Sequence, residues 1–174
     1  ASSPPRAPPG LPLPVGRAAC FAKDRLGTRD KPLVALMDGV VMGAGCALAM
    51  PAIERIATER TRFAMPEAGI GFYPDGGAQY FLPKCPGGTG MYLALTGARI
   101  GGADAVYLGL ATTSVPAQSL DALIEALAGG ASPGVAAASF AEDTGPAPLA
   151  AHGEAIERCF TRDSVAAIVE ALER

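Results

Sequence analysis

The chain has little of what several common functional sites require. Its 174 residues include no tryptophan, one histidine and 6% aromatic residues, and its net charge is −3. Without a basic excess or many aromatic side chains for base stacking, the composition argues against a nucleic-acid-binding protein. The lone histidine, His152, has no cysteine close to it in sequence, which argues against a zinc site. A single histidine in the chain also argues against a Ser–His–Asp triad. We therefore expect no metal ion and no redox cofactor.

Cysteine usage and hydropathy bear on the compartment. The four cysteines are widely spaced and form no CxxC pair, which is typical of reduced thiols, so we expect a cytoplasmic location. No run of about 18 apolar residues is present, so no membrane span is expected. The first 23 residues carry three basic and no acidic residues, as transit peptides do, which leaves a mitochondrial location as the alternative. Six prolines in the same stretch argue against the amphipathic helix of such peptides.

The length allows one domain with a tail, and composition divides the chain into four parts. Residues 1–30 are rich in proline and predict an extended or disordered N-terminal segment. Residues 31–128 form the candidate core. Residues 129–150, rich in Gly, Ala, Ser and Pro, predict a linker, and residues 151–174 predict a C-terminal helical segment.

Hydrophobic patterning predicts an α/β protein. A buried strand over 31–39 leads into a helix over 43–50, and strands follow over 55–58 and 61–65. This order implies a crossover unit in an α/β layer arrangement. Further elements are predicted as helices over 76–82, 90–96, 102–107 and 120–127, a strand over 110–115, and two helices within 154–172, the second capped by Thr161 or Asp163.

Two features between residues 38 and 77 suggest chemistry at an acyl group. The first is the Gly-rich turn Asp38-Gly39-Val40-Val41-Met42-Gly43-Ala44-Gly45, which can present backbone N–H groups to a developing oxyanion. The second is the pair of carboxylates Glu67 and Asp75, set in an irregular loop that is rich in glycine. Such a pair can transfer protons or attack a carbonyl carbon.

Several blocks of sequence resemble the crotonase superfamily and, within it, the 3-hydroxyisobutyryl-CoA hydrolase branch. The blocks are Lys31-Pro32, Met37-Asp38-Gly39, Met42-Gly43-Ala44-Gly45, Ala57-Thr58-Glu59, Phe63-Ala64-Met65-Pro66-Glu67, Gly71-Phe72-Tyr73-Pro74-Asp75-Gly76-Gly77, Tyr80-Phe81-Leu82-Pro83, Tyr92-Leu93-Ala94-Leu95-Thr96-Gly97 and Gly109-Leu110-Ala111-Thr112. They remain in register through about eighty residues. A second region, from Ile156 to Leu172, is similar to a later stretch of the same branch.

The resemblance implies a partial fold of stacked ββα units with C-terminal helices. It implies an acyl-CoA thioester of a short branched acid as substrate, with CoA as part of that substrate, in valine catabolism. It also implies that Glu67 and Asp75 are the catalytic carboxylates, and that the backbone at Gly43, Ala44 and Gly71 binds the substrate. Ala44 N–H would be one oxyanion donor. The resemblance further allows a homo-oligomer.

This sequence also departs from the family pattern. The loop that supplies the second oxyanion N–H is matched only loosely by residues 16–24, and the chain looks truncated at both ends. Two alternatives to the hydrolase therefore remain open. One is an enoyl-CoA hydratase or isomerase, although the first of the two hydratase glutamates would align with Ala47, which cannot carry a proton. The other is a non-catalytic fragment that binds acyl-CoA weakly or acts in assembly.

Overall fold

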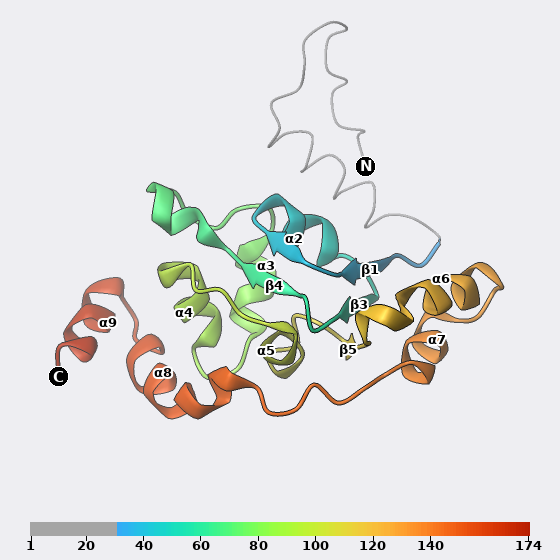
Figure 1. Cartoon of the computed structure of the whole chain (residues 1–174). Helices are drawn as coiled ribbons and strands as arrows, with labels where there is room; N and C mark the ends of the chain where they lie inside the picture. Colours follow the sequence, from blue (N-terminus) through green and yellow to red (C-terminus); the bar gives the residue numbers. More distant parts are fainter. Residues whose placement is uncertain (1–30) are drawn as a thin grey trace, which may run out of the picture.

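Short parallel strands form two sheets in the part of the chain that the computed structural model describes, residues 31–174 (Figure 1). The predictions made for residues 1–30 lie outside the described residues. One sheet has the order β1-β3-β5 and the other pairs β2 with β4, and every ladder within them is parallel. The strands are β1 (Val34–Met37), β2 (Val40–Met42), β3 (Glu54–Ala57), β4 (Arg62–Ala64) and β5 (Thr113–Ser114).

The strands follow a repeated pattern of two strands and a helix. β1 and β2 lead into α2 (Ala44–Ala49), and β3 and β4 lead into the 3-10 helix η1 (Pro66–Ile70). The first strands of the two units pair with each other in one sheet, and the second strands pair in the other. This arrangement confirms the predicted fold of stacked ββα units.

Helices cover the sheets and continue to the C-terminus (Figure 1). They are α3 (Ala78–Phe81), η2 (Leu82–Lys84), α4 (Thr89–Thr96), α5 (Gly102–Tyr107), η3 (Ala117–Ser119), α6 (Leu120–Ala128), α7 (Pro133–Ser139), η4 (Pro148–His152), α8 (Gly153–Phe160) and α9 (Val165–Leu172). The helices predicted over 90–96, 102–107 and 120–127 are confirmed as α4, α5 and α6. Gly97 ends α4 in the left-handed conformation that glycine adopts readily, with φ 64°.

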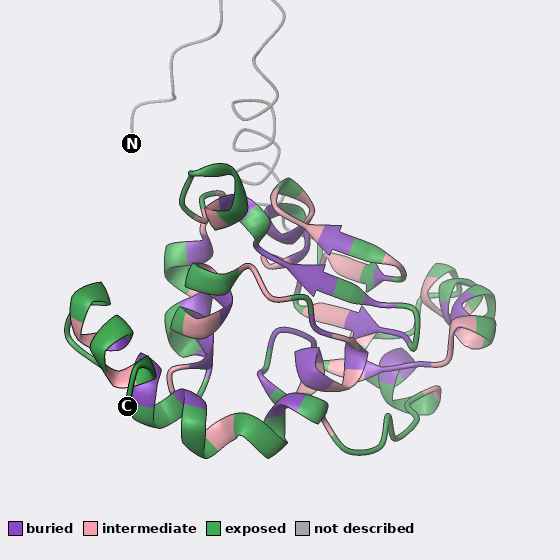
Figure 2. Ribbon diagram, turned by 60° about the vertical axis from the view of Figure 1, so that its left-hand side comes forward, coloured by how far each residue is buried: buried purple, intermediate pink, exposed green. Residues whose placement is uncertain are grey.

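The buried hydrophobic residues form two clusters. Figure 2 marks the buried stretches of the ribbon in purple, on the strands and on the helices that cover them. The larger one joins the β2–β4 sheet to α4 and α8, with Phe63 and Leu93 completely buried. The smaller one joins β3 and β5 to α6 and α7 through Ile56, Val115 and Leu123. The larger cluster also includes Met37 and Ala57, at the ends of β1 and β3. Because burial of apolar surface is the main stabilising term, these clusters hold the helices against the two sheets.

Three sequence predictions differ from the structure. β2 was not predicted, because three residues between two turn signals are too short for a periodicity to show. The predicted linker over 129–150 contains α7, which begins with a proline at a favourable first-turn position and packs Ala136 and Ala137 into the smaller cluster. The cap of α9 is Ser164, neither Thr161 nor Asp163, since its hydroxyl accepts from Ala167 N–H at 3.2 Å.

A buried threonine ties the β3–β4 turn to the end of β1. Thr61 is fully buried, and its hydroxyl donates to the Met37 carbonyl while accepting from Thr58 N–H at 2.8 Å. The Thr58 hydroxyl in turn donates to Asp38 at 2.7 Å, and Arg60 forms an ion pair with the same carboxylate. These contacts hold the β1–β2 turn against the β3–β4 turn.

We expect Thr61→Val to lower the free energy of unfolding by roughly 2–4 kcal/mol, because it leaves one buried donor and one buried acceptor without partners. Urea unfolding followed by circular dichroism measures the change. Thr61→Ser is the matched control, since it keeps the hydroxyl and should lose much less stability. Equal losses for the two variants would show that the hydroxyl contributes little.

Candidate functional site

The turn from β2 into α2 lies beside the end of β4. Met42 pairs with Ala64 in the parallel ladder, so both strands end at the same edge of the sheet. Gly43 follows β2 with φ 50° and ψ −117°, and its N–H donates to the Ala64 carbonyl at 3.3 Å. The chain leaving β4 reaches Glu67 three residues after Ala64, which brings Glu67 back to this turn.

The carboxyl group of Glu67 is buried against Gly43. Glu67 is 9% exposed, and Oε1 lies 3.0 Å from the position that a Cβ would occupy at Gly43. The other oxygen, Oε2, is buried and has no hydrogen-bond partner within the described residues. Buried carboxyl oxygens are nearly always hydrogen-bonded, so an unpartnered one points to a group held ready for a ligand or reactant.

A free backbone donor lies next to this carboxyl group. Within residues 31–174, Ala44 N–H has no acceptor, whereas Cys46 and Ala47 N–H both donate to the Gly43 carbonyl, at 3.0 and 3.3 Å. The first N–H groups of a helix lack partners within it and carry a partial positive charge. Ala44 is exposed, so this donor remains open to other groups in the described structure.

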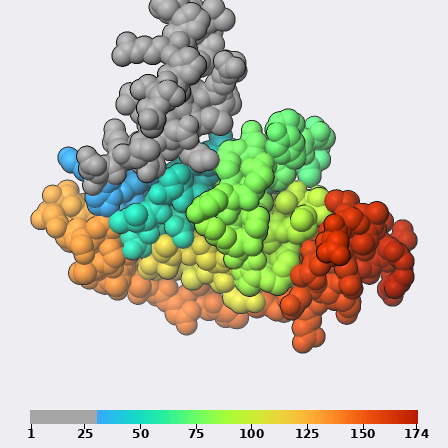
Figure 3. All heavy atoms as spheres, turned by 180° about the vertical axis from the view of Figure 1, so that it is seen from behind, coloured from blue at the N-terminus to red at the C-terminus, as the bar shows by residue number. Residues whose placement is uncertain are grey.

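Gly76, the residue after Asp75, lies against the same helix. The Asp75 carbonyl accepts from Ala78 N–H at 2.9 Å, which forms a turn at the start of α3. Gly76 then lies so close to α2 that a Cβ there would be 2.7 Å from Ala47 Cβ. In the space-filling view, atoms of the teal part of the chain, which includes α2, border atoms of the green part, which includes Gly76 in the sequence colouring (Figure 3). The structure thus brings Glu67 to the first turn of α2 and the backbone beside Asp75 to its second turn.

Gly71 differs from the other predicted site residues. It ends η1 in the left-handed conformation, and its N–H donates to the Ala68 carbonyl at 3.2 Å. That N–H closes a turn and is therefore already engaged. The predicted second donor, in residues 16–24, lies outside the described residues.

Cys46 lies in the floor of the site. It is completely buried, as expected for a small core residue, and its thiol donates to the carbonyls of Val41 and Ala64 at 3.2 and 3.5 Å. Burial raises the pKa of Cys46 to about 12, and the nearby Glu67 carboxylate acts in the same direction. A thiol in this state is a structural donor and a poor nucleophile.

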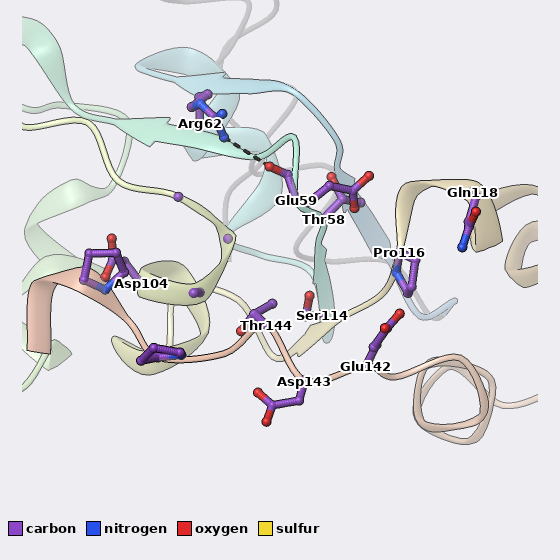
Figure 4. Close-up of a pocket in the computed structure, with 15 residues that line it drawn as sticks. Thr58, Glu59, Arg62, Asp104, Ser114, Pro116, Gln118, Glu142, Asp143 and Thr144 are labelled. Carbon is purple, nitrogen blue, oxygen red and sulfur yellow. Dashed lines mark hydrogen bonds between the residues drawn. The ribbon is translucent and has the colours of Figure 1, made fainter.

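A cavity of about 680 Å³ lies elsewhere in the molecule (Figure 4). Acidic side chains line it, from Glu59 in the β3–β4 turn, Asp104 in α5 and Glu142 after α7. None of the site residues predicted from the sequence contacts it. Over the described residues, no three His, Cys, Asp or Glu side chains gather as metal ligands would. In the same range, no helix has the length and hydrophobicity that a membrane crossing requires.

The comparison with protein families covers most of the chain. The model of the enoyl-CoA hydratase/isomerase family matches residues 20–174. The chain belongs to this family. A crystal structure of a carnitinyl-CoA dehydratase from Mycobacterium thermoresistibile is 38% identical, with a TM-score of 0.79, and the match covers 92% of this chain and 49% of that one. The crotonase-like fold and the sequence resemblance are thereby confirmed.

Curated relatives point to the hydrolase branch. The protein named 3-hydroxyisobutyryl-CoA hydrolase, mitochondrial, from Danio rerio is 41% identical over 91% of this chain and 44% of its own length. The chain therefore spans less than half the length of that relative. The small ribosomal subunit protein mS47 of Neurospora crassa is 50% identical over 59% of this chain and 20% of its own length. The Danio rerio protein's name agrees with the mitochondrial alternative, and nothing supports the cytoplasmic expectation.

The buried thiol of Cys46 makes stability depend on pH. A thiol exposed in the unfolded chain ionises near its ordinary pKa of 9.0, whereas Cys46 in the fold stays neutral up to a pKa of about 12. The stabilisation is full below pH 9 and is lost as the pH rises toward 12. We expect the unfolding free energy of Cys46→Ala to fall by about 1 kcal/mol less between pH 8 and 10 than that of the unaltered chain.

Urea unfolding at pH 8 and pH 10 measures this difference. The matched control is Val41→Ala, which removes buried methyl groups and no ionisable group, so it should retain the pH dependence of the unaltered chain. An identical pH dependence for Cys46→Ala would contradict the expectation.

Proposed function

We propose that this chain hydrolyses a short branched acyl-CoA thioester, of the 3-hydroxyisobutyryl-CoA type, to the free acid and CoA. The observation that carries the proposal is the buried Glu67 carboxyl group, with Oε1 against Gly43 and Oε2 unpartnered in the described residues. Gly43 is followed directly by Ala44, whose N–H has no acceptor among residues 31–174. CoA enters the reaction as part of the substrate, and the proposal requires no separate cofactor.

Ala44 N–H supplies the stabilisation of the oxyanion in this mechanism. As the thioester carbonyl is attacked, its oxygen becomes negative, and a fixed N–H donor at the mouth of a helix stabilises that charge without reorganising. Losing one such donor typically costs about 10²–10³ in rate. Because the donor is a backbone group, its position depends on the turn at Gly43 and on the hydrogen bond from Gly43 N–H to β4.

Glu67 acts on the carbonyl carbon in one of two ways. It attacks directly, which forms an acyl-enzyme anhydride that water then hydrolyses to the free acid, or it deprotonates an attacking water. In both routes the C–S bond breaks and CoA leaves as a thiolate, which needs only a weak acid. Asp75, carried by the turn that Gly76 seats on α2, orients the water or relays the proton. Burial of Glu67 limits its competing contacts with solvent.

The hydratase reading is less well supported by the residues present. Hydratases of this superfamily use two glutamates to add water across a C=C bond. By the sequence resemblance, the first of these glutamates aligns with Ala47. That side chain is 2% exposed and faces the backbone of Gly76. We therefore infer that the site acts on the thioester. The similarity to hydrolases named as mitochondrial supports a mitochondrial location, where the chain would act in the degradation of a branched acid.

A second candidate function is a non-catalytic role in a small ribosomal subunit. The identity of 50% to the Neurospora crassa ribosomal protein mS47 favours it. Co-sedimentation of the chain with small ribosomal subunits through a sucrose gradient, unchanged by Glu67→Gln, is the result that this role predicts.

We expect the chain to release free CoA from 3-hydroxyisobutyryl-CoA faster than it consumes the enoyl absorbance of crotonyl-CoA. Glu67→Gln should lower the rate of CoA release by about 10²–10⁴-fold, because the amide neither attacks nor accepts a proton. Asp75→Asn should lower the rate less. A thiol-reactive dye follows CoA release, and ultraviolet absorbance follows the enoyl group.

The matched control for these variants is Glu125→Gln, on the exposed face of α6, which should retain full activity. CoA release that survives Glu67→Gln unchanged would contradict the hydrolase mechanism. Loss of crotonyl-CoA absorbance without CoA release would favour the hydratase.

A further inference from the structure

The contact between Gly76 and Ala47 is closer than two side chains allow. Gly76 has φ +58°, and a Cβ built there would lie 2.7 Å from Ala47 Cβ and 3.9 Å from Ala47 Cα. Ala47 is 2% exposed within α2, so it cannot turn away from the loop. Since interiors are packed close to crystal density, the space between residues 47 and 76 holds one methyl group and no more.

The turn that carries Asp75 is tied together by its own hydrogen bonds. The Asp75 carbonyl accepts from Ala78 N–H at 2.9 Å, and the Pro74 carbonyl accepts from the Gln79 side-chain amide at 2.7 Å. A shift of the backbone at Gly76 is therefore transmitted to Asp75, because the flanking residues are bonded across it.

The other partner in the contact is fixed to the proposed oxyanion donor. Ala47 lies one helical turn after Ala44, and its N–H donates to the Gly43 carbonyl at 3.3 Å. Gly43 is also the residue that Glu67 Oε1 approaches. The distance from residue 47 to residue 76 thus sets the separation of the Asp75 turn from both Ala44 N–H and Glu67.

We propose that Ala47 and Gly76 form a size-matched positioning pair that sets Asp75 opposite Glu67 and Ala44 N–H. The proposal deepens the proposed hydrolase function and rests on it. It also accounts for the choice between reactions: a glutamate at position 47 and the seated Asp75 turn exclude each other, because both need the same space. The pair selects the loop carboxylate as the second acid of the site.

Reciprocal exchange of the methyl group tests the pair. Gly76→Ala should lower kcat for CoA release from 3-hydroxyisobutyryl-CoA by roughly 10–100-fold, as a misplacement of about 1 Å does. The double variant Ala47→Gly with Gly76→Ala should recover about tenfold of that loss, since residues in direct contact couple strongly. No recovery in the double variant would overturn the proposal.

Gly109→Ala is the matched control for backbone strain. Gly109 has φ +72° and nothing within 4 Å of its Cβ position, so alanine there meets the same left-handed strain without the contact. It should retain kcat, and Ala47→Gly should not alter its effect. A loss as large as that of Gly76→Ala would assign the effect to strain and overturn the proposal.

The Asp75→Asn background shows whether Gly76 acts through Asp75. There Gly76→Ala should cause little further loss of kcat, whereas an equal further loss would mean that Gly76 acts by another route and would overturn the proposal. If Gly76→Ala does not fold, Ala47→Ser adds one atom from the other side of the contact and takes its place. Its kcat should fall in the unaltered chain and not in the Asp75→Asn background.

Thermal unfolding separates this proposal from the proposed function. The melting temperatures of the two single variants and the double variant report the contact without any reaction. If the chain has no thioesterase activity but the double variant still recovers its melting temperature, the hydrolase function is wrong and the contact between residues 47 and 76 stands. If the chain is active but the double variant shows no such recovery, the positioning pair alone is wrong.

Discussion

The carboxyl group of Glu67 lies against the backbone of Gly43 because glycine leaves open the space that a side chain would fill. A Cβ at this position would meet Oε1 at 3.0 Å, so any other residue would push the carboxyl away from the helix mouth. The parallel pairing of β2 with β4 brings these two residues to the same edge of the sheet. Backbone pairing, a missing side chain and one buried acid thus define the site together.

Keeping an unpartnered carboxyl oxygen buried costs free energy, so the surrounding structure must hold Glu67 in place. The N-terminal proline of η1 fixes the backbone just before Glu67, and the Glu67 carbonyl accepts from Phe72 N–H at 3.0 Å. The Cys46 thiol, which is completely buried nearby, donates to the carbonyls of Val41 and Ala64. Backbone contacts within its own segment therefore hold Glu67 in place.

The sequence pointed to candidate site residues, but it did not predict the contacts that position them. The Gly-rich turn at Gly43 was visible locally, whereas Ala44 and Glu67 were proposed as site residues because the surrounding blocks of sequence resemble the crotonase superfamily. The seating of Gly76 on Ala47 was not visible, since 29 positions separate the two residues and only the fold brings them together. Secondary structure failed for similar reasons: α7 has the composition of a linker, and its burial against β3 and β5 decides that it is helical.

Two small residues at the start of α2, Gly43 just before it and Ala47 within it, are explained by two different contacts. Gly43 admits a carboxyl group, and Ala47 leaves room for the backbone of Gly76. Gly45 has no such cause within residues 31–174, because nothing there lies within 4 Å of its Cβ position. Ala47 is buried, whereas Ala44 is exposed and Gly45 is half-buried, so the start of α2 is not packed away as a whole among the described residues. An uncovered helix mouth next to a buried acid is the arrangement that an approaching carbonyl group requires.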